Sequence, residues 1–336
     1  MSAWYTDRYE NDDVVLSTRI RLARNLSGFP FPSKMTNDDR IKLNSMVERA
    51  ILDSNTPFSK SLKFINMKNV PENEKYSMVE RHIISPEFAS SDKERAIIIS
   101  EDESICIMIG EEDHLRIQVI CGGLQLEKAY NTAEELDTLL CDALNFAFDE
   151  NLGFLTECPT NLGTGLRASV MLHLPVTESD GNMSDLVSSI NKIGFTVRGM
   201  YGEGSKSAAS LYQISNQITL GISEKNALDN LKIITLQLIE RERKGREGLN
   251  RLMAEDLSMR ALGILKNARI LSSEEMMKLL SRIKLGIDLG IIEEENIIPV
   301  KLLIEAQPFM LMRKFGAMTP DERDIYRANL IRNALK

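Results

Sequence analysis

The stretch that decides the fold runs from Ala96 to Gly123 and reads AIIISEDESICIMIGEEDHLRIQVICGG. Three of its segments, AIIIS, SICIMIG and LRIQVICGG, are rich in β-forming residues, and short polar turns separate them. Such closely spaced runs predict a meander of strands. The turn between the last two runs, Glu111 to His114, is expected to be the tip of a hairpin.

The chain before this meander predicts an arm, a strand and a helix. Ser17, Arg19 and Arg21 alternate on one parity within DVVLSTRIRLARNL, which indicates a strand whose polar face carries arginines. Residues 38–52 place apolar side chains at helical spacing. Residues 1–16 are short and polar, so we expect an N-terminal arm and not a domain.

The chain after the meander predicts further helices. TAEELDTLLCDALNFAFDE is expected to be a helix that starts at a capping box of Thr132 and Glu135. A strand, a helix over 184–193 and a glycine-rich loop over 198–208 are expected to follow. The pattern then becomes helical throughout, with a break near Gly245 or Gly248.

The prediction is therefore an α+β chain. An antiparallel sheet flanked by helices is expected over residues 1–248, followed by an all-helical C-terminal domain over 249–336. The boundary is soft, because neither a repeat nor a low-complexity linker marks it.

The composition excludes several classes of protein. The chain has 336 residues, 43% hydrophobic content and a formal net charge of -8. No signal peptide and no apolar run of membrane-spanning length is recognisable, so we expect a cytoplasmic protein with neither a membrane partner nor direct nucleic-acid binding. Its four cysteines and three histidines follow no metal-ligand spacing, which predicts free thiols and no metal site of protein side chains.

Five arginines stand beside predicted strands and turns: Arg19, Arg21, Arg116, Arg167 and Arg198. Taken alone, each arginine is better explained as a solvated surface charge than as a ligand-binding group. Guanidinium groups match phosphate oxygens with paired hydrogen bonds, so several that converge would suit a triphosphate. The nucleotide motifs GxxxxGK[ST] and GxGxxG are absent, and the spacing by itself does not show convergence.

Two further features could carry chemistry. Glu111, Glu112 and Asp113 form an acidic hairpin tip, which is either a solvated turn or a general base and anchor for a cationic substrate. Cys158 begins CPTNLGTGLRASV, where it is either a small core residue or a thiolate favoured by nearby N–H groups and Arg167.

The segments STRIRLARNLSGF, EEDHLR and CPTNLGTGLRASV, in this order and spacing, resemble the phosphagen (guanidino) kinase family. The catalytic domain of that family is an antiparallel sheet flanked by helices. The resemblance implies Mg-ATP as cosubstrate, Glu112 as the catalytic carboxylate, Glu111 and Asp113 as support for it or for Mg2+, and Cys158 as the thiol beside the guanidinium. It also implies a nucleotide site made of Ser17, Arg19, Arg21, His82, Arg116, Arg167 and Arg198.

Departures from the family pattern bear on the substrate. Kinases of free arginine or creatine carry a helical N-terminal domain that closes over the substrate, whereas only 16 residues precede Ser17 here. Met171 replaces a histidine on the adenine side, and Thr219 stands where an arginine is expected. Without the lid, we expect an open acceptor site that admits an arginine still within a protein.

The whole chain is similar to the bacterial protein arginine kinases, a branch of this family. That resemblance implies Glu203 as a second carboxylate on the acceptor guanidinium. It also implies a C-terminal domain that dimerises and binds phosphoarginine through Arg323, Asp324, Arg327 and Ser273. An ordinary amphipathic helix explains the same C-terminal charges, so both interpretations stay open here.

The resemblance also implies partners. They are a heat-shock transcriptional repressor as substrate, a zinc-containing activator protein and the Clp protease that receives marked proteins. Two other functions stay open from the sequence: a free-guanidine phosphagen kinase, and a non-catalytic adaptor that binds phosphoarginine.

Overall fold

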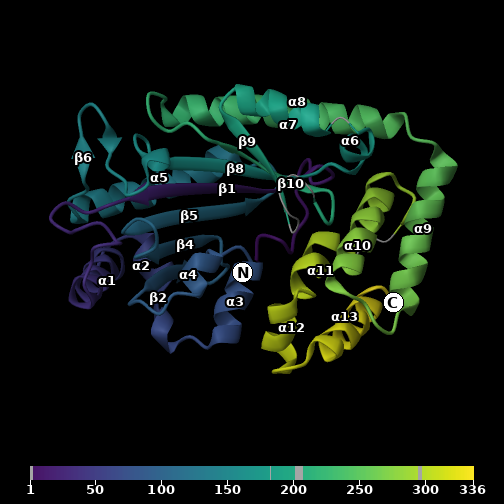
Figure 1. Ribbon diagram of the computed structural model, residues 1–336, viewed down its shortest axis with the longest axis horizontal. Coiled ribbons are helices and arrows are strands. Elements are labelled where there is room, and N and C mark those ends of the chain that lie inside the picture. The colour runs from purple at the N-terminus through teal and green to yellow at the C-terminus, as the bar shows by residue number, and fades with distance from the viewer. Residues whose placement is uncertain (1–2, 182, 201–206, 294–296) are drawn as a thin grey trace.

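The computed structural model describes residues 3–181, 183–200, 207–293 and 297–336. A β-sheet packed between helices forms the larger part of it (Figure 1). Every neighbouring pair of strands in the main sheet is antiparallel. The order across its eight strands is β2 (Leu62–Asn66), β3 (Ala96–Ser100), β4 (Ile105–Ile109), β5 (Leu115–Gly122), β1 (Val15–Arg24), β8 (Leu166–His173), β10 (Leu211–Asn216) and β9 (Phe195–Gly199). The predicted meander is confirmed as β3, β4 and β5.

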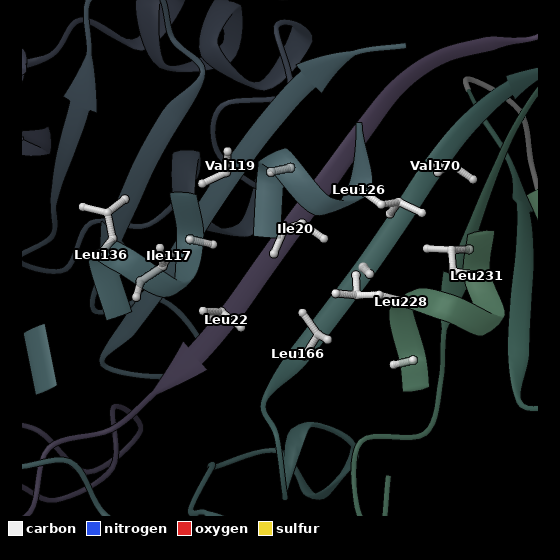
Figure 2. Packing of buried hydrophobic residues seen from close by; sticks show 14 of the residues in the cluster. Ile20, Leu22, Ile117, Val119, Leu126, Leu136, Leu166, Val170, Leu228 and Leu231 are labelled. Atoms are coloured by element: carbon white, nitrogen blue, oxygen red, sulfur yellow. The ribbon is translucent and has the colours of Figure 1, made fainter. Parts of the chain in front are cut away.

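One face of the sheet carries the largest apolar core. Ile20 of β1 and Ile117 of β5 are fully buried there, under Leu136 of α5 (Leu126–Ala143) and Leu231 of α8 (Glu224–Glu247) (Figure 2). Alternate residues of a strand point to opposite faces, so this packing directs the odd-numbered arginines of β1 to the other face. The helix α1 (Asn37–Leu52) covers the same core and confirms the prediction for 38–52.

The opposite face is partly covered by short helices and by the C-terminal helices. Met108 of β4 packs in a second cluster with Phe88 of α4 (Pro86–Ala89) and Met78 of α3 (Glu72–Glu80). The C-terminal helices lie beside this face (Figure 1): α9 (Arg251–Asn267), α10 (Ser273–Asp288), α11 (Pro299–Glu305), α12 (Pro308–Phe315) and α13 (Pro320–Ala334).

The N-terminal arm joins the sheet to the C-terminal helices. Trp4 and Tyr5 are buried in a third cluster that contains Ile120 of β5 and Leu280 of α10. The arm also packs on the end of β5, because a Cβ atom added at Gly122 would lie 2.0 Å from the Tyr9 ring. The arm therefore forms part of the core between the sheet and the helices.

Both ends of one helix were predicted wrongly, since α5 ends at Ala143 and the strand β6 (Phe148–Asp149) lies within the predicted span. The helix α5 begins at Leu126, six residues before Thr132, and the Thr132 hydroxyl donates to the Lys128 carbonyl inside it. Leu126 and Ala129 are buried on the sheet, so packing extends the helix past the apparent capping signal. The predicted break is confirmed, since α8 ends at Glu247 with Gly248 as its cap.

Further short elements are α2 (Pro57–Ser61), α6 (Pro175–Ser179), α7 (Met183–Lys192) and the hairpin of β6 (Phe148–Asp149) and β7 (Gly153–Phe154). The helix α7 agrees with the prediction for 184–193. None of the helices in the described part of the chain combines the length and apolarity needed to cross a bilayer.

Candidate active site

The strand register brings the predicted arginines to one face of the sheet. Arg21 of β1 lies directly opposite Arg167 of β8, and Arg116 of β5 lies opposite Ala23, which shares the parity of Arg21. Directly opposite residues on neighbouring strands stand about 5 Å apart and diagonal ones about 7–8 Å, so Arg167 and Arg116 flank Arg21 on the same face of the sheet. Arg198 of β9 pairs with Gln213 of β10, whose amide oxygen accepts from Arg19 at 3.0 Å.

The arginines repel one another across this face. Burial, followed by the charges of Arg167 and Arg116, lowers the pKa of Arg19 to about 10. The pKa of Arg21 is also lowered, first by burial and then by its three arginine neighbours. For Arg167 the causes are burial and then Arg198 and Arg116. An anion bound among these groups would relieve both the repulsion and the desolvation.

Two of the guanidinium groups have unused donors. The Nε atoms of Arg21 and Arg167 are buried and lack a hydrogen-bond partner within the described ranges. Arg167 makes one contact through Nη2, which donates to the Ser215 hydroxyl at 3.2 Å. Buried donors are normally satisfied, so these atoms fit a ligand with several acceptor oxygens, such as a triphosphate.

The acidic hairpin tip is tied to the arginine face. Glu111 is buried and accepts from the Arg116 Nη1 and from the Ser85 hydroxyl, both at 2.7 Å. The Glu112 carboxylate is 44% exposed and accepts from Arg116 Nη2 at 3.2 Å. Of the two glutamates, Glu112 is therefore the one whose carboxylate remains open to a substrate.

Asp113 joins the hairpin tip to the loop that carries the thiol. Its Oδ1 accepts from the Glu157 N–H at 2.8 Å and from the Asn25 amide at 2.7 Å, and its side chain is buried. Glu157 precedes Cys158, and Asp113 follows Glu112. The hydrogen bond between Asp113 and Glu157 therefore joins the residue next to Glu112 to the residue next to Cys158.

Cys158 is half-buried at the start of its loop. Its sulfur lies 3.1 Å from the Thr160 hydroxyl. The following turn is seated on β1, because a Cβ atom added at Gly165 would lie 2.6 Å from the Ala23 carbonyl oxygen. Gly165 also has a φ of +61°, which favours glycine.

Sequence reasoning missed two residues that build this region. Arg24 is buried, forms an ion pair with Asp137 at 2.7 Å and donates to the Thr164 carbonyl at 2.9 Å. Asn25 contacts the acidic hairpin tip through Asp113 and the His114 N–H, and it contacts the segment before Cys158 through the Leu155 carbonyl. Arg24 is even-numbered, whereas Arg19 and Arg21 are odd-numbered, so the strand pattern already indicated that Arg24 points to the other face of the sheet. No local sequence pattern indicated the role of Asn25.

His82 and Ser17 lie at the edge of the arginine face. Burial and then the charge of Arg19 lower the pKa of His82 to about 3, so the ring is neutral. Its centroid lies 6.1 Å from that of Trp4. Ser17 is buried on β1 opposite Met171.

The predicted phosphoarginine residues come together between α10 and α13. Arg327 is 1% exposed and donates to the Leu271 carbonyl at 2.8 Å, to the Ala306 carbonyl at 2.9 Å and to Asp324. Ser273 begins α10, two residues after Leu271. Arg327 is therefore largely committed to the protein, and the half-buried Arg323 is the more available cation.

Glu203 lies outside the described residues. In the part of the chain that the structure describes, no cluster of three or more His, Cys, Asp or Glu side chains is arranged to hold a metal ion.

Two family models match consecutive parts of the chain. The model for the ATP:guanido phosphotransferase C-terminal catalytic domain matches residues 42–245, and that for the protein-arginine kinase McsB C-terminal domain matches residues 251–336. The sheet and its arginine face thus define a phosphagen kinase, and the chain belongs to the ATP:guanido phosphotransferase family.

Two similar proteins show to which branch of the family the chain belongs. A protein-arginine kinase from Halothermothrix orenii is 45% identical over 341 positions, which cover 100% of this chain and 97% of that protein. One from Clostridium kluyveri is 45% identical over 343 positions, covering 100% and 99%. Within its class, the chain belongs to the protein-arginine kinases, which confirms the resemblance read from its motifs.

Solved structures confirm the fold class. A lombricine kinase matches with a TM-score of 0.62 at 22% identity, covering 73% of this chain and 70% of that one. The duplicated taurocyamine kinase from Schistosoma mansoni, with bound transition-state analogue components, matches with a TM-score of 0.64 at 22% identity, covering 94% and 42%.

Proposed function

We propose that this chain transfers the γ-phosphoryl group of Mg-ATP to the guanidinium of arginine residues in proteins. The observation that carries the proposal is the face where Arg19, Arg21, Arg116 and Arg167 converge, with unused buried Nε donors on two of them. The family to which the chain belongs gives the reaction class, and the names of its relatives give the protein substrate.

The arginine face would hold the triphosphate at the hairpin tip. Phosphoryl transfer depends mainly on positioning and charge stabilisation, which fixed guanidinium groups supply. Arg116 contacts both Glu111 and Glu112, so it can place a phosphate oxygen close to the catalytic carboxylate. His82, as a neutral ring, suits the adenine side, and Ser17 and Arg198 complete the nucleotide site.

In the proposed step, a nitrogen of the acceptor guanidinium attacks the γ-phosphorus. The N–P bond forms as the bond from phosphorus to the ADP oxygen breaks, and Glu112 accepts the proton that the nitrogen loses. Arginine is protonated at ordinary pH, so the nitrogen needs this base. Cys158 would orient the guanidinium from the other side of the site, together with Glu203.

The supporting carboxylates have different roles in this proposal. Glu111 orients Arg116, and Asp113 holds the hairpin tip against the thiol loop. Mg2+ would neutralise charge on the phosphate oxygens of the nucleotide that carries it. No residue of this chain is assigned as its ligand.

The proposal extends to regulation and partners. Arg323, Asp324 and Ser273 would bind phosphoarginine, and Arg327, whose guanidinium donates to Asp324 and to two backbone carbonyls, would mainly hold Asp324 in place. A second copy of the chain would pack on the C-terminal helices. The family resemblance suggests a heat-shock transcriptional repressor as substrate, a zinc-containing activator protein and the Clp protease, all in the cytoplasm. Exposed Leu252 and Met253 on α9 offer apolar surface for one such contact.

A parallel assay tests the acceptor class. The protein is incubated with Mg-ATP and either a folded protein or free arginine, and phosphoarginine is measured by mass spectrometry under conditions that spare N–P bonds. We expect phosphoarginine in the protein and little turnover of free arginine. Equal turnover of both acceptors would favour a free-guanidine kinase, and no product in either arm would favour a phosphoarginine-binding adaptor.

A further inference from the structure

Thr219 is a departure from the family pattern that the proposed reaction does not use. It lies three residues after the end of β10, stands where an arginine is expected, and is 7% exposed. A buried threonine in a connecting loop needs partners for its hydroxyl, and those partners indicate what the residue does.

The segment that carries Thr219 is fixed to the central sheet. The side chain of Asn216 donates to the Leu166 carbonyl at 2.9 Å and to the Ile218 carbonyl at 3.1 Å, and it accepts from the Ala168 N–H at 2.8 Å. Asn216 is itself buried. Thr219 is therefore mounted on β8 and β10 and not on a freely moving loop.

Thr219 contacts the thiol loop through both its side chain and its backbone. The hydroxyl lies 2.7 Å from the Leu162 carbonyl oxygen and 3.0 Å from that of Thr160, and it shares its single proton between them. The Thr219 carbonyl accepts from the Thr164 N–H at 3.0 Å. A Cβ atom added at Gly163 would lie 2.3 Å from that same carbonyl oxygen, so the turn rests directly on Thr219.

These contacts lead to the thiol in two steps. Thr219 fixes the backbone of Thr160, and the Thr160 hydroxyl lies 3.1 Å from the Cys158 sulfur. We propose that Thr219 is a positioning residue for Cys158: its hydroxyl closes the turn over 160–164 and thereby holds the thiol at the acceptor site. The kinetic part of this inference rests on the proposed function, whereas the structural part does not.

The matched variants are Thr219→Val, which keeps the β-branched shape without the hydroxyl, and Thr219→Ser, which keeps the hydroxyl. Thr132→Val removes a hydroxyl that donates to the Lys128 carbonyl within α5 and serves as the control. The first readout is the rate at which iodoacetamide alkylates Cys158 in the full-length chain, followed by peptide mass spectrometry. This readout requires no kinase activity.

Loss of the hydroxyl should let the turn open locally and expose the thiol. We expect Thr219→Val to be alkylated at Cys158 about threefold faster than the parent chain, with Thr219→Ser and the control unchanged. The kcat for a protein acceptor should fall about tenfold in Thr219→Val, because the guanidinium loses its alignment, while the KM for ATP changes little.

Each outcome decides the inference. Alkylation of Cys158 at the parent rate in Thr219→Val overturns it, as does a kcat loss that Thr219→Ser shares. Thr219→Val could be alkylated faster while neither the parent chain nor any variant makes phosphoarginine. That result would support the positioning role and reject the proposed function. If Thr219→Val fails to fold, Thr219→Ala removes the same hydroxyl and is judged by the same criteria.

Discussion

Asn25→Ala tests the link between the two catalytic loops. The Asn25 amide donates to Asp113 at 2.7 Å and to the Leu155 carbonyl at 3.0 Å, and its oxygen accepts from the His114 N–H at 2.8 Å. The side chain is 1% exposed, so water does not replace it freely. Leaving the buried His114 N–H and an Asp113 oxygen short of partners should lower the free energy of unfolding by about 3 kcal/mol.

The same substitution should lower activity by more than the loss of folded protein explains. Asn25 and Asp113 together hold the hairpin tip of Glu112 against the loop of Cys158. A small displacement between these loops would misalign the acceptor nitrogen with the γ-phosphorus. We expect kcat to fall about a hundredfold, measured as the initial rate of phosphoarginine formation well below the melting temperature.

Urea unfolding followed by tryptophan fluorescence measures the stability change, since Trp4 is the sole tryptophan and is buried. Asn151→Ala, at an exposed asparagine of the β6–β7 turn, serves as the control and should match the parent chain. The reasoning is refuted if Asn25→Ala keeps both the urea midpoint and the kcat of the parent chain.

Three further predictions concern charge and packing. Arg21→Met should raise the melting temperature of the nucleotide-free protein, because it removes a buried repelling charge, and should weaken ATP binding about tenfold by calorimetry; unchanged ATP affinity would contradict its assignment. Gly122→Ala should displace Tyr9 and lower the melting temperature, which Tyr9→Ala in the same chain should partly restore. Glu80 accepts from the N–H groups that begin α12, and burial raises the pKa of its carboxyl to about 7. Because this pKa lies above the unfolded value, the stability that the protonated carboxyl contributes is lost as pH rises from about 5 to 8. Glu80→Gln should flatten the pH dependence of the melting temperature in this window, and an unchanged slope would show that the carboxylate is not the titrating group.

Much of the fold was predictable because its signals are local. The alternation of Ser17, Arg19 and Arg21 predicts both the strand and the face that its arginines share. The start of α5 was not predictable in this way, because the burial of Leu126 and Ala129 against the sheet overrides the capping signal at Thr132. Helix boundaries follow tertiary packing where packing and local signals disagree.

The site was predictable only in part. The motifs identify Glu112 and Cys158, but the bond between Asp113 and the Glu157 N–H joins residues that are far apart in the sequence. The role of Asn25 depends on the same long-range contacts. Arg327 was likewise not predictable, because the sequence pattern of α13 does not show that its guanidinium donates to the Leu271 and Ala306 carbonyls.

The central claim concerns the carboxylate that accepts the proton. Glu112→Gln keeps the size of the side chain and the exposed position but removes the base. The most direct measurement is the rate of phosphoarginine formation in a protein by this variant, with ATP affinity measured in parallel. The account predicts ATP affinity within about twofold of the parent and a rate lower by about a thousandfold. A variant that phosphorylates protein arginine at the parent rate would contradict it.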